Sequence, residues 1–362
     1  PHIMWEAPSF SSLTQAVRDP SKPIGMRMRA AYFLRTEHGR SSESDGITDL
    51  KQIQQRQKDV ISALSHGLKE REHGSLMRHE FAYIMGQLRD ERCCDTLEEI
   101  LQRDEDCVMV RHEAAEALGA IGASRSKIVL ERVMKHAKDL PELAETCRIA
   151  LDVMNWRESG SDPDTAPAAC ACMLNPYSSV DPAPPHPAHA NKTMPELGDI
   201  LCDSSLPIFE RYRAMFSLRN MGGTEAVAQL CRALTQDASS ALLRHEVAYV
   251  LGQMQDPTSI EALEESLRRV DEHSMVRHES AEALGAIEGR WDAVERILNG
   301  FLNDKDDVVR ESCLVALDAA DYWGHSTEND DDGVGVNDST SFTQLKAKDS
   351  QPKPVLANHF NI

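Results

Sequence analysis

The sequence has no apolar run of the roughly 18 residues that a membrane-spanning helix requires, so we do not expect a membrane protein. Basic residues are the minority charge, because 39 Lys and Arg stand against 59 Asp and Glu, which gives a formal net charge of −20. This balance argues against a surface that binds nucleic acid or an anionic membrane. It suits a partner that carries a cationic, polyamine-like group.

The sequence also lacks the signs of a secreted protein. Its beginning has no charged segment followed by an apolar stretch, so we expect no signal peptide. The nine cysteines form no Cys-x-x-Cys unit, and an odd number without such units is typical of reduced thiols inside the cell. We therefore expect a cytoplasmic protein.

No segment alternates apolar and polar residues in the way that a β-strand does. Apolar residues instead recur at helical spacing, as at Val110, Ala114 and Leu118. Short breaks that contain Gly, Asp or Pro separate these segments. The sequence therefore predicts an all-α protein.

What the sequence does contain is an internal duplication. The segment LMRHEFAYIMGQL (76–88) returns as LLRHEVAYVLGQM (242–254), and MVRHEAAEALGAI (109–121) returns as MVRHESAEALGAI (275–287). Both copies follow at the same offset in numbering, 166, and the two segments of each half are related by an offset of 33. A repeat of this length without a tetratricopeptide or ankyrin signature fits short HEAT-like helical hairpins. We expect an α-solenoid of about eight such hairpins, in two pseudo-symmetric halves of four.

The two halves differ in length. MRAAYFLR (28–35) matches YRAMFSLR (212–219) at an offset of 184 instead of 166, so the first half contains 18 extra residues. The polar stretch 39–56 is the expected insert, and we expect it to form a mobile loop. The expected boundaries are 8–156 for the first half, 157–193 for a poorly ordered linker rich in Pro, Ala and Ser, 194–322 for the second half and 323–362 for an acidic, disordered tail.

Four Arg-His-Glu triplets occupy equivalent places in this duplicated frame, and their histidines are His79, His112, His245 and His278. One interpretation is that duplication copied a pattern in which Glu near a helix start complements the helix dipole. However, four glutamates gathered on one concave face would repel one another. A bound divalent metal removes that conflict, because neutral imidazole and carboxylate are its natural ligands. Ligands without thiolate favour iron or manganese over structural zinc, and two equivalent halves imply two metal ions.

Two further pairs of residues lie four positions after the triplet histidines. Glu116 and Glu282 follow the second histidine of each half, and they either orient an imidazole or pair with a neighbouring Arg. Tyr83 and Tyr249 follow the first histidine of each half. They either donate hydrogen bonds into the cleft or pack in the core.

In these segments the chain resembles the deoxyhypusine hydroxylases, a family of HEAT-repeat di-iron monooxygenases. The resemblance covers 19–155 and 195–320, and six segments carry it: LMRHEFAYIMGQL, MVRHEAAEALGAIG, FERYRAMFSLRNMGG, LLRHEVAYVLGQM, MVRHESAEALGAI and VVRESCLVALD. It implies O2-dependent hydroxylation of the deoxyhypusine side chain on the precursor of translation initiation factor 5A, which gives hypusine. It also implies two Fe2+ ions and an external electron donor. We expect a monomer with no nucleic-acid or membrane partner.

The resemblance further implies a division of roles among the eight triplet residues. The iron ligands would be His79, His112, Glu113, His245, His278 and Glu279. Glu80 and Glu246 would face the substrate, whose ammonium groups suit charge-assisted hydrogen bonds to carboxylates. The alternative is a non-enzymatic HEAT-repeat scaffold that binds a basic protein partner through its concave face. A third class, the bilin-lyase-like short HEAT proteins, shares the repeat but does not require four His-Glu pairs.

Overall fold

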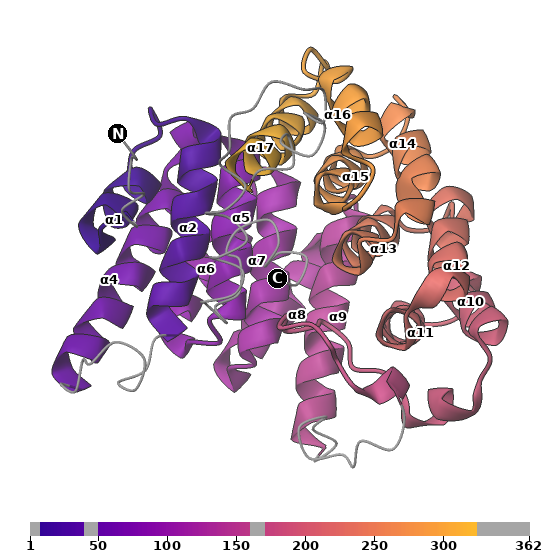
Figure 1. Ribbon diagram of the computed structural model, residues 1–362. Helices are drawn as coiled ribbons and strands as arrows, with labels where there is room; N and C mark the ends of the chain where they lie inside the picture. The colour runs from indigo at the N-terminus through magenta and orange to yellow at the C-terminus, as the bar shows by residue number, and fades with distance from the viewer. Residues whose placement is uncertain (1–7, 40–49, 160–170, 324–362) are drawn as a thin grey trace, which may run out of the picture.

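The computed structural model describes residues 8–39, 50–159 and 171–323. Across these residues the chain forms 16 α-helices joined by short turns, and it contains no β-strand (Figure 1). The all-α, two-part solenoid predicted from the repeats is therefore confirmed. None of the described helices combines the length and the apolar character that spanning a bilayer would require.

The first half consists of four helical hairpins, each of which pairs an outer helix with an inner one. The outer helices are α1 (Phe10–Arg18), α4 (Leu50–Lys69), α6 (Cys94–Leu101) and α8 (Lys127–His136). The inner helices are α2 (Ile24–Gly39), α5 (Gly74–Gln87), α7 (Val108–Ile121) and α9 (Pro141–Glu158). Successive inner helices pack side by side, so they form one continuous row.

The second half repeats this plan. Its outer helices are α10 (Met194–Cys202), α12 (Gly223–Gln236), α14 (Ile260–Arg268) and α16 (Trp291–Asn299). Its inner helices are α11 (Ile208–Met221), α13 (Ala241–Met254), α15 (Ser274–Ala286) and α17 (Asp307–Trp323). Short 3-10 turns precede several helices: η1 (Arg71–His73), η2 (Glu91–Cys93), η3 (Ser124–Ser126) and η7 (Pro257–Ser259).

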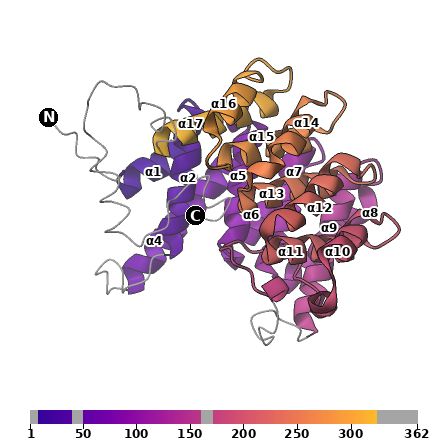
Figure 2. The same cartoon turned by 45° about the vertical axis from the view of Figure 1, so that its right-hand side comes forward.

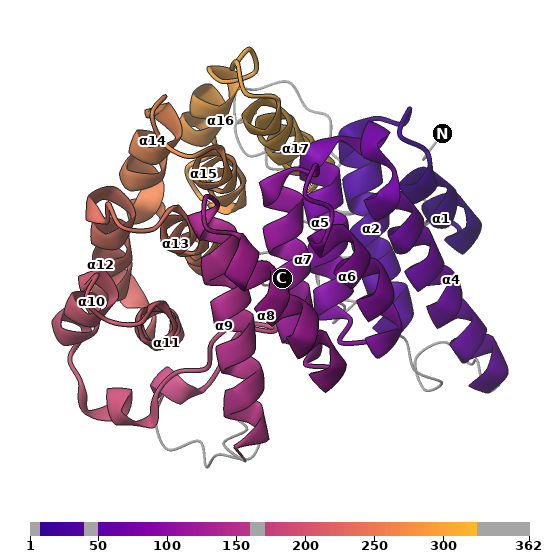
Figure 3. The same cartoon turned by 180° about the vertical axis from the view of Figure 1, so that it is seen from behind.

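The two halves meet at both ends of their inner rows. The last inner helix of the first half, α9, packs against α11 and α13, as the view from behind shows (Figure 3). The last inner helix of the second half, α17, packs against α2 and α5 (Figure 1). The rows therefore face each other across an enclosed centre, and a turned view places α13 and α15 in front of α5 and α7 (Figure 2).

Two features of the repeated segments explain why the inner helices pack so closely and so regularly. A Cβ atom added at Gly86 would lie 2.8 Å from the Cα atom of Ala117 on the next inner helix, so only glycine fits there. Three of the four triplet arginines satisfy carbonyl groups in the last turn of the preceding outer helix, since Arg78 Nε donates to Leu68 O at 2.8 Å. Arg111 and Arg277 make the same bond to Leu101 and Leu267. The arginine of each of these triplets is therefore structural.

Two predicted segments differ from the expectation. Leu50–Arg56, assigned to the inserted loop, form the first turns of α4, while residues 40–49 lie outside the described residues.

Within the expected linker, residues 171–193 contain the 3-10 turns η5 (Ala171–Met173) and η6 (Pro187–Asn191). They also bury Cys172, Ala183 and His189. Their proline-rich composition did not reveal that they pack against the helices. Residues 160–170 and 324–362, which include the expected tail, lie outside the described residues.

Candidate metal centre

The four triplet histidines lie in the second turn of the four central inner helices, α5, α7, α13 and α15. The sequence reasoning placed them at the helix starts, and the helices begin about one turn earlier than that. The four side chains are buried, and so are the four glutamates that follow them. The His-Glu pairs are therefore shielded from solvent.

The imidazole rings of both halves gather into one cluster. The ring centroids of His79 and His112 are 5.4 Å apart, and those of His245 and His278 are also 5.4 Å apart. Contacts across the two halves are equally short, because His79 lies 5.3 Å from His278 and His112 lies 5.3 Å from His245. Each half thus contributes a pair, and the two pairs meet.

The glutamates of the second and fourth triplets approach these rings in a symmetric way. Glu113 Oε2 lies 3.1 Å from Nε2 of His79, and Glu279 Oε2 lies 3.4 Å from Nε2 of His245. His79, His112 and Glu113 place one ligand atom each within 4.8 Å of one another, as do His79, His245 and His278. The carboxylate of one repeat therefore reaches the imidazole of the preceding repeat in both halves.

The donor set fits a divalent metal ion. Both ring nitrogens of His112 are buried and have no hydrogen-bond partner among the described protein groups. A buried polar atom without a partner costs about 1–3 kcal/mol, and a metal ion is the natural partner for neutral imidazole. Burial, followed by the neighbouring His245, lowers the pKa of His112 well below its ordinary value, so this ring is neutral and able to bind metal.

His79 has the opposite tendency. Burial alone would lower its pKa, but the Glu113 carboxylate, with a contribution from Glu80, raises the pKa of His79 well above the ordinary value. Burial, followed by the Glu116 carboxylate, raises the pKa of Glu246. These carboxylates and imidazoles therefore share protons when no cation is bound. A cation in the cluster would release the protons, because metal ions bind the deprotonated ligands.

Glu80 and Glu246, which the resemblance assigned to substrate, occupy different positions. Glu80 Oε1 lies 3.1 Å from Nδ1 of His79, and its other oxygen accepts a hydrogen bond of 2.7 Å from the hydroxyl of Tyr32. Glu246 lines a cavity at the centre, and Glu80 is not among the residues that line it. The structure thus brings both glutamates to the cluster but only Glu246 to the cavity.

The four residues expected to support the histidines also separate into different environments. Glu282 Oε1 lies 3.5 Å from Nδ1 of His278 and accepts a hydrogen bond from Ser312. Glu116 lines the cavity instead. Tyr83 and Tyr249 join the halves directly, because their hydroxyl oxygens are 3.0 Å apart. Both tyrosines are also buried in the hydrophobic core, so they combine core packing with a hydrogen bond that joins the two halves.

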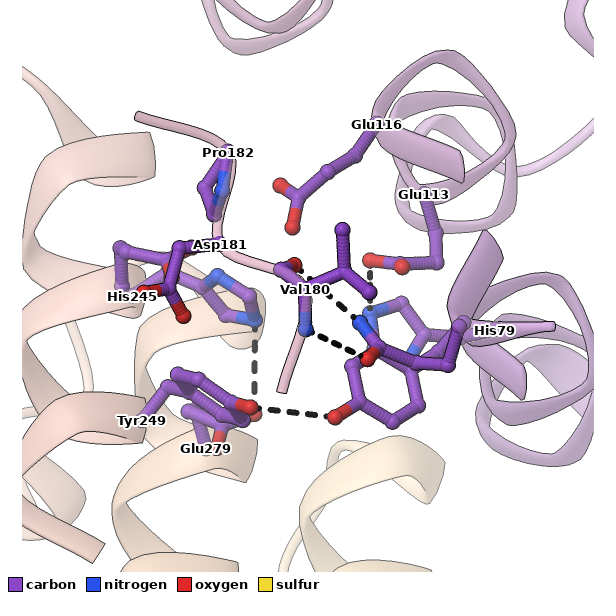
Figure 4. A pocket seen from close by; sticks show the side chains of 12 residues that line it. His79, Glu113, Glu116, Val180, Asp181, Pro182, His245, Tyr249 and Glu279 are labelled. Atoms are coloured by element: carbon purple, nitrogen blue, oxygen red, sulfur yellow. Dashed lines mark hydrogen bonds and ion pairs between the residues drawn. The ribbon is translucent and has the colours of Figure 1, made fainter. Parts of the chain in front are cut away.

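The cavity beside the histidines measures about 20 Å3, which is enough for one or two water molecules. Figure 4 shows the chain at Val180 passing between the helix that carries His79 and the helix that carries His245. The lining residues are His79, Tyr83, Gln87, Glu113, Glu116, Val180, Asp181, Pro182, His245, Glu246, Tyr249 and Glu279. The sequence reasoning missed Gln87 and the segment from Val180 to Pro182.

These missed residues differ in the signal that could have revealed them. Gln87 and its counterpart Gln253 belong to the duplicated segments, at the same offset of 166 as the histidines. A search of the duplication for every repeated polar residue would have found them. Val180, Asp181 and Pro182 lie outside the duplication, in a segment that composition alone described as a linker.

Comparison with known proteins finds related sequences over most of this chain. The sequence matches the HEAT repeat family over residues 61–152, 194–271 and 243–318. The deoxyhypusine hydroxylase of Xenopus laevis is 43% identical over 312 residues, which cover 86% of this chain and 90% of that protein. The deoxyhypusine hydroxylase of Drosophila melanogaster is 44% identical over 325 residues, with coverages of 90% and 95%.

A solved structure shows the same fold. The structure of human deoxyhypusine hydroxylase in complex with glycerol superposes with a TM-score of 0.72 at 38% sequence identity, and the match covers 86% of this chain and 96% of that one. The relatives are matched over nearly their whole length, and the matched part of this chain contains both halves of the repeat. The chain therefore belongs to the deoxyhypusine hydroxylase family.

Proposed function

We propose that this protein is a non-haem di-iron monooxygenase that hydroxylates the deoxyhypusine side chain of the precursor of translation initiation factor 5A, which gives hypusine. Membership of the family supports the hydroxylation of deoxyhypusine. The observation that carries the iron chemistry is the symmetric pair of contacts from Glu113 to His79 and from Glu279 to His245, within a single buried cluster of four imidazoles.

His79, His112 and Glu113 would hold one iron ion, and the equivalent three residues of the second half would hold the other: His245, His278 and Glu279. Such histidine and carboxylate sets leave coordination positions open, and bound Fe2+ would supply the activation of O2. His112 supplies a neutral imidazole, because burial and the neighbouring His245 lower its pKa. Glu282 would orient His278 through the Nδ1 contact of 3.5 Å.

The rest of the site suits a cationic side chain. Deoxyhypusine carries a secondary and a terminal ammonium group, and buried carboxylates bind such groups through charge-assisted hydrogen bonds. Glu246 and Glu116 line the cavity and would face these ammonium groups. The formal net charge of −20 would favour the encounter with a basic protein surface around the modified side chain.

The stoichiometry requires a partner that supplies electrons. Hydroxylation converts a C–H bond to C–OH with one oxygen atom of O2, and two electrons and two protons reduce the other atom to water. The chain provides carboxylates that can carry protons near the site, among them Glu116 and Glu246. An external reductant would provide the electrons. The cytoplasmic location and the monomeric state stay predictions from the sequence.

The test combines iron quantitation with mass spectrometry. The purified protein, reconstituted with Fe2+, is incubated in air with a reductant and a factor 5A precursor that bears deoxyhypusine. We expect stoichiometric iron and a gain of one oxygen atom on the modified side chain. A correctly folded, iron-free protein that binds the factor without changing its mass would support the scaffold alternative instead.

A further inference from the structure

Residues 175–185, which we call the strap, cross the metal centre between the two halves. They lie outside every helix, and they contain Pro176, Pro182, Pro184 and Pro185. Proline fixes its backbone torsion and restricts the residue before it, so the strap is a stiff segment, and it bends at residues 177–179 and 182–183. Asp181 is its only charged residue.

Side chains from equivalent positions in the two halves hold the strap. From the first half, Gln87 accepts a hydrogen bond of 2.8 Å from Val180 N and donates one of 3.3 Å to Val180 O. From the second half, Gln253 donates to Ser179 Oγ at 3.1 Å. The two glutamines are related by the offset of 166, so the duplication supplies one to each side of the strap.

A second symmetric pair holds the neighbouring residues. Arg35 donates to Ser178 O at 3.3 Å, and its counterpart Arg219 binds both oxygens of Asp181 at 2.8 and 2.6 Å. The arginines occupy corresponding places in the segments that match at an offset of 184. Residues 178–181 are thus bound from both halves, although no helix contains them.

The strap supplies the apolar part of the cavity wall. Among the twelve residues that line the cavity, Val180 and Pro182 alone have aliphatic side chains, and the others are His, Glu, Asp, Gln or Tyr. Val180 and Asp181 also border a larger cavity of about 310 Å3, whose other lining residues include Trp156 and Leu174. The strap therefore separates a space large enough for a ligand from the metal centre.

We propose that residues 178–182 form the specificity-determining wall of the substrate channel, in which Val180 and Pro182 contact the methylene groups of the substrate side chain while Gln87 and Gln253 position the wall. This inference rests on the proposed function, because the substrate is a long aliphatic amine. A cavity of about 20 Å3 cannot contain that chain, so the strap shifts when the side chain enters from the larger cavity. The lining residues that belong to helices are held by core packing, whereas the strap is held by polar side-chain contacts. The strap is therefore the part of the wall that can shift.

The first measurement is binding without turnover. The affinity of the iron-loaded protein for a deoxyhypusine-bearing factor 5A is measured by calorimetry in the absence of O2. Val180→Ala removes apolar contact, and each buried methylene contributes about 0.8 kcal/mol, so the Kd is expected to rise about tenfold. Val180→Ile preserves the contact and should keep the Kd within about threefold of wild type. In air, KM should rise with the Kd, while kcat changes little.

The second measurement reports on the glutamines directly. Hydrogen exchange of the Val180 amide, which donates to Gln87, is expected to accelerate at least about tenfold in Gln87→Leu. Gln57→Leu is the matched control, because Gln57 also donates to a backbone carbonyl, that of His38, outside the strap. Melting temperatures identify any variant that does not fold. Val180→Ala then keeps the test decisive, since it changes no contact between helices.

The outcomes separate the two proposals. If the Kd of Val180→Ala is unchanged and the wild-type protein hydroxylates the factor, residues 178–182 do not determine specificity, but the proposed function is still supported. Unchanged exchange at Val180 in Gln87→Leu would overturn the positioning role of the glutamine. A wild-type protein that binds iron but neither binds nor hydroxylates the factor would contradict both the proposed function and the proposed role of residues 178–182.

Discussion

The two halves of this protein present the same Arg-His-Glu triplets but surround their glutamates differently. In the first half, Tyr32 on α2 donates a hydrogen bond of 2.7 Å to Glu80. In the second half, the residue at the matching position is Phe216, which has no hydroxyl group to donate. Glu246, the counterpart of Glu80, lines the cavity. The same triplet therefore holds one glutamate against the core and presents the other to the centre.

A second difference concerns Glu116 and Glu282, and here the glutamate of the first half is the one that faces the cavity. In the second half, Ser312 donates to Glu282, which lies 3.5 Å from His278. In the first half, the matching residue is Thr146, whose hydroxyl donates to a backbone carbonyl instead. Glu116, the counterpart of Glu282, is left to line the cavity. The contacts from Glu113 to His79 and from Glu279 to His245 are symmetric, whereas Glu116 and Glu246 line the cavity without their counterparts Glu282 and Glu80. A duplicated fold can thus repeat its His-Glu pairs and still form a cavity whose carboxylates are arranged unsymmetrically.

The largest expected effect tests the symmetric part of this comparison. His112→Ala removes a ring whose two nitrogens have no protein partner, so about half of the bound iron or more should be lost, together with hydroxylation. His278→Ala, at the equivalent position, should lose a similar amount. Iron per folded chain is measured by atomic spectroscopy. Full iron content in either variant would contradict the ligand assignment.

The second effect tests the unsymmetric part. Glu246→Gln should retain iron and reduce kcat/KM about 10–100-fold, because a hydrogen bond to a charged group contributes about 1.5–3 kcal/mol. Glu80→Gln should also retain iron, with a smaller loss of activity, since Glu80 does not line the cavity. Steady-state kinetics and iron content are measured on the same preparations. Equal losses in the two variants would show that the glutamates form a symmetric pair despite their different surroundings.

The third effect concerns stability. Burial, followed by the Glu80 carboxylate, raises the pKa of Tyr32 well above its ordinary value, so its hydroxyl stays protonated and donates. Tyr32→Phe should therefore lower the free energy of unfolding by about 1–3 kcal/mol, since the acceptor Glu80 is buried and would lose its donor. Tyr212→Phe is the control in the other half, because Tyr212 donates to the neutral carbonyl of Leu242 at 3.3 Å. Urea unfolding should show the larger loss for Tyr32→Phe, and a larger loss for Tyr212→Phe would be the contrary result.

The symmetric part of the site could be predicted from the sequence, and the reason is physical. His79 and His245 occur in long segments that the duplication preserved, and packing gives no reason to repeat a buried His-Glu pair. The constant spacing between the triplets of each half places equivalent side chains on adjacent inner helices, where their convergence follows from the solenoid. The helical class and the facing halves follow from the same periodicity.

The unsymmetric part could not be predicted in the same way. The difference between Tyr32 and Phe216 is visible once the segments are aligned, but its consequence depends on which glutamate lies within reach of the hydroxyl. The position of Val180 depends on contacts from Gln87, which is distant in sequence. Composition describes the strap as proline-rich, and it carries no information about where a stiff segment is bound.

The smallest expected effect tests one junction between the halves through its pH dependence. Glu142 Oε1 on α9 lies 3.6 Å from Nε2 of His273 at the start of α15, and the neighbouring His273 side chain lowers the pKa of Glu142 below its ordinary value of 4.5. A lowered folded-state pKa stabilises the fold above the unfolded pKa, and this contribution is lost as the pH falls through the folded pKa. Glu142→Gln should cost about 0.5 kcal/mol at pH 7 and almost nothing near pH 3.

Glu145, on the same helix, provides the opposing control. It accepts a hydrogen bond of 2.7 Å from Ser240 in the second half, but burial raises its pKa above the ordinary value. The charged form of Glu145 is therefore disfavoured in the folded protein, and Glu145→Gln should become relatively more favourable as the pH rises. Urea unfolding between pH 3 and 7 gives the unfolding free energy of each variant relative to wild type. This difference should change with pH in opposite directions for the two variants. If the difference changed with pH in the same direction for both variants, net charge, and not these two contacts, would determine how the junction responds to pH.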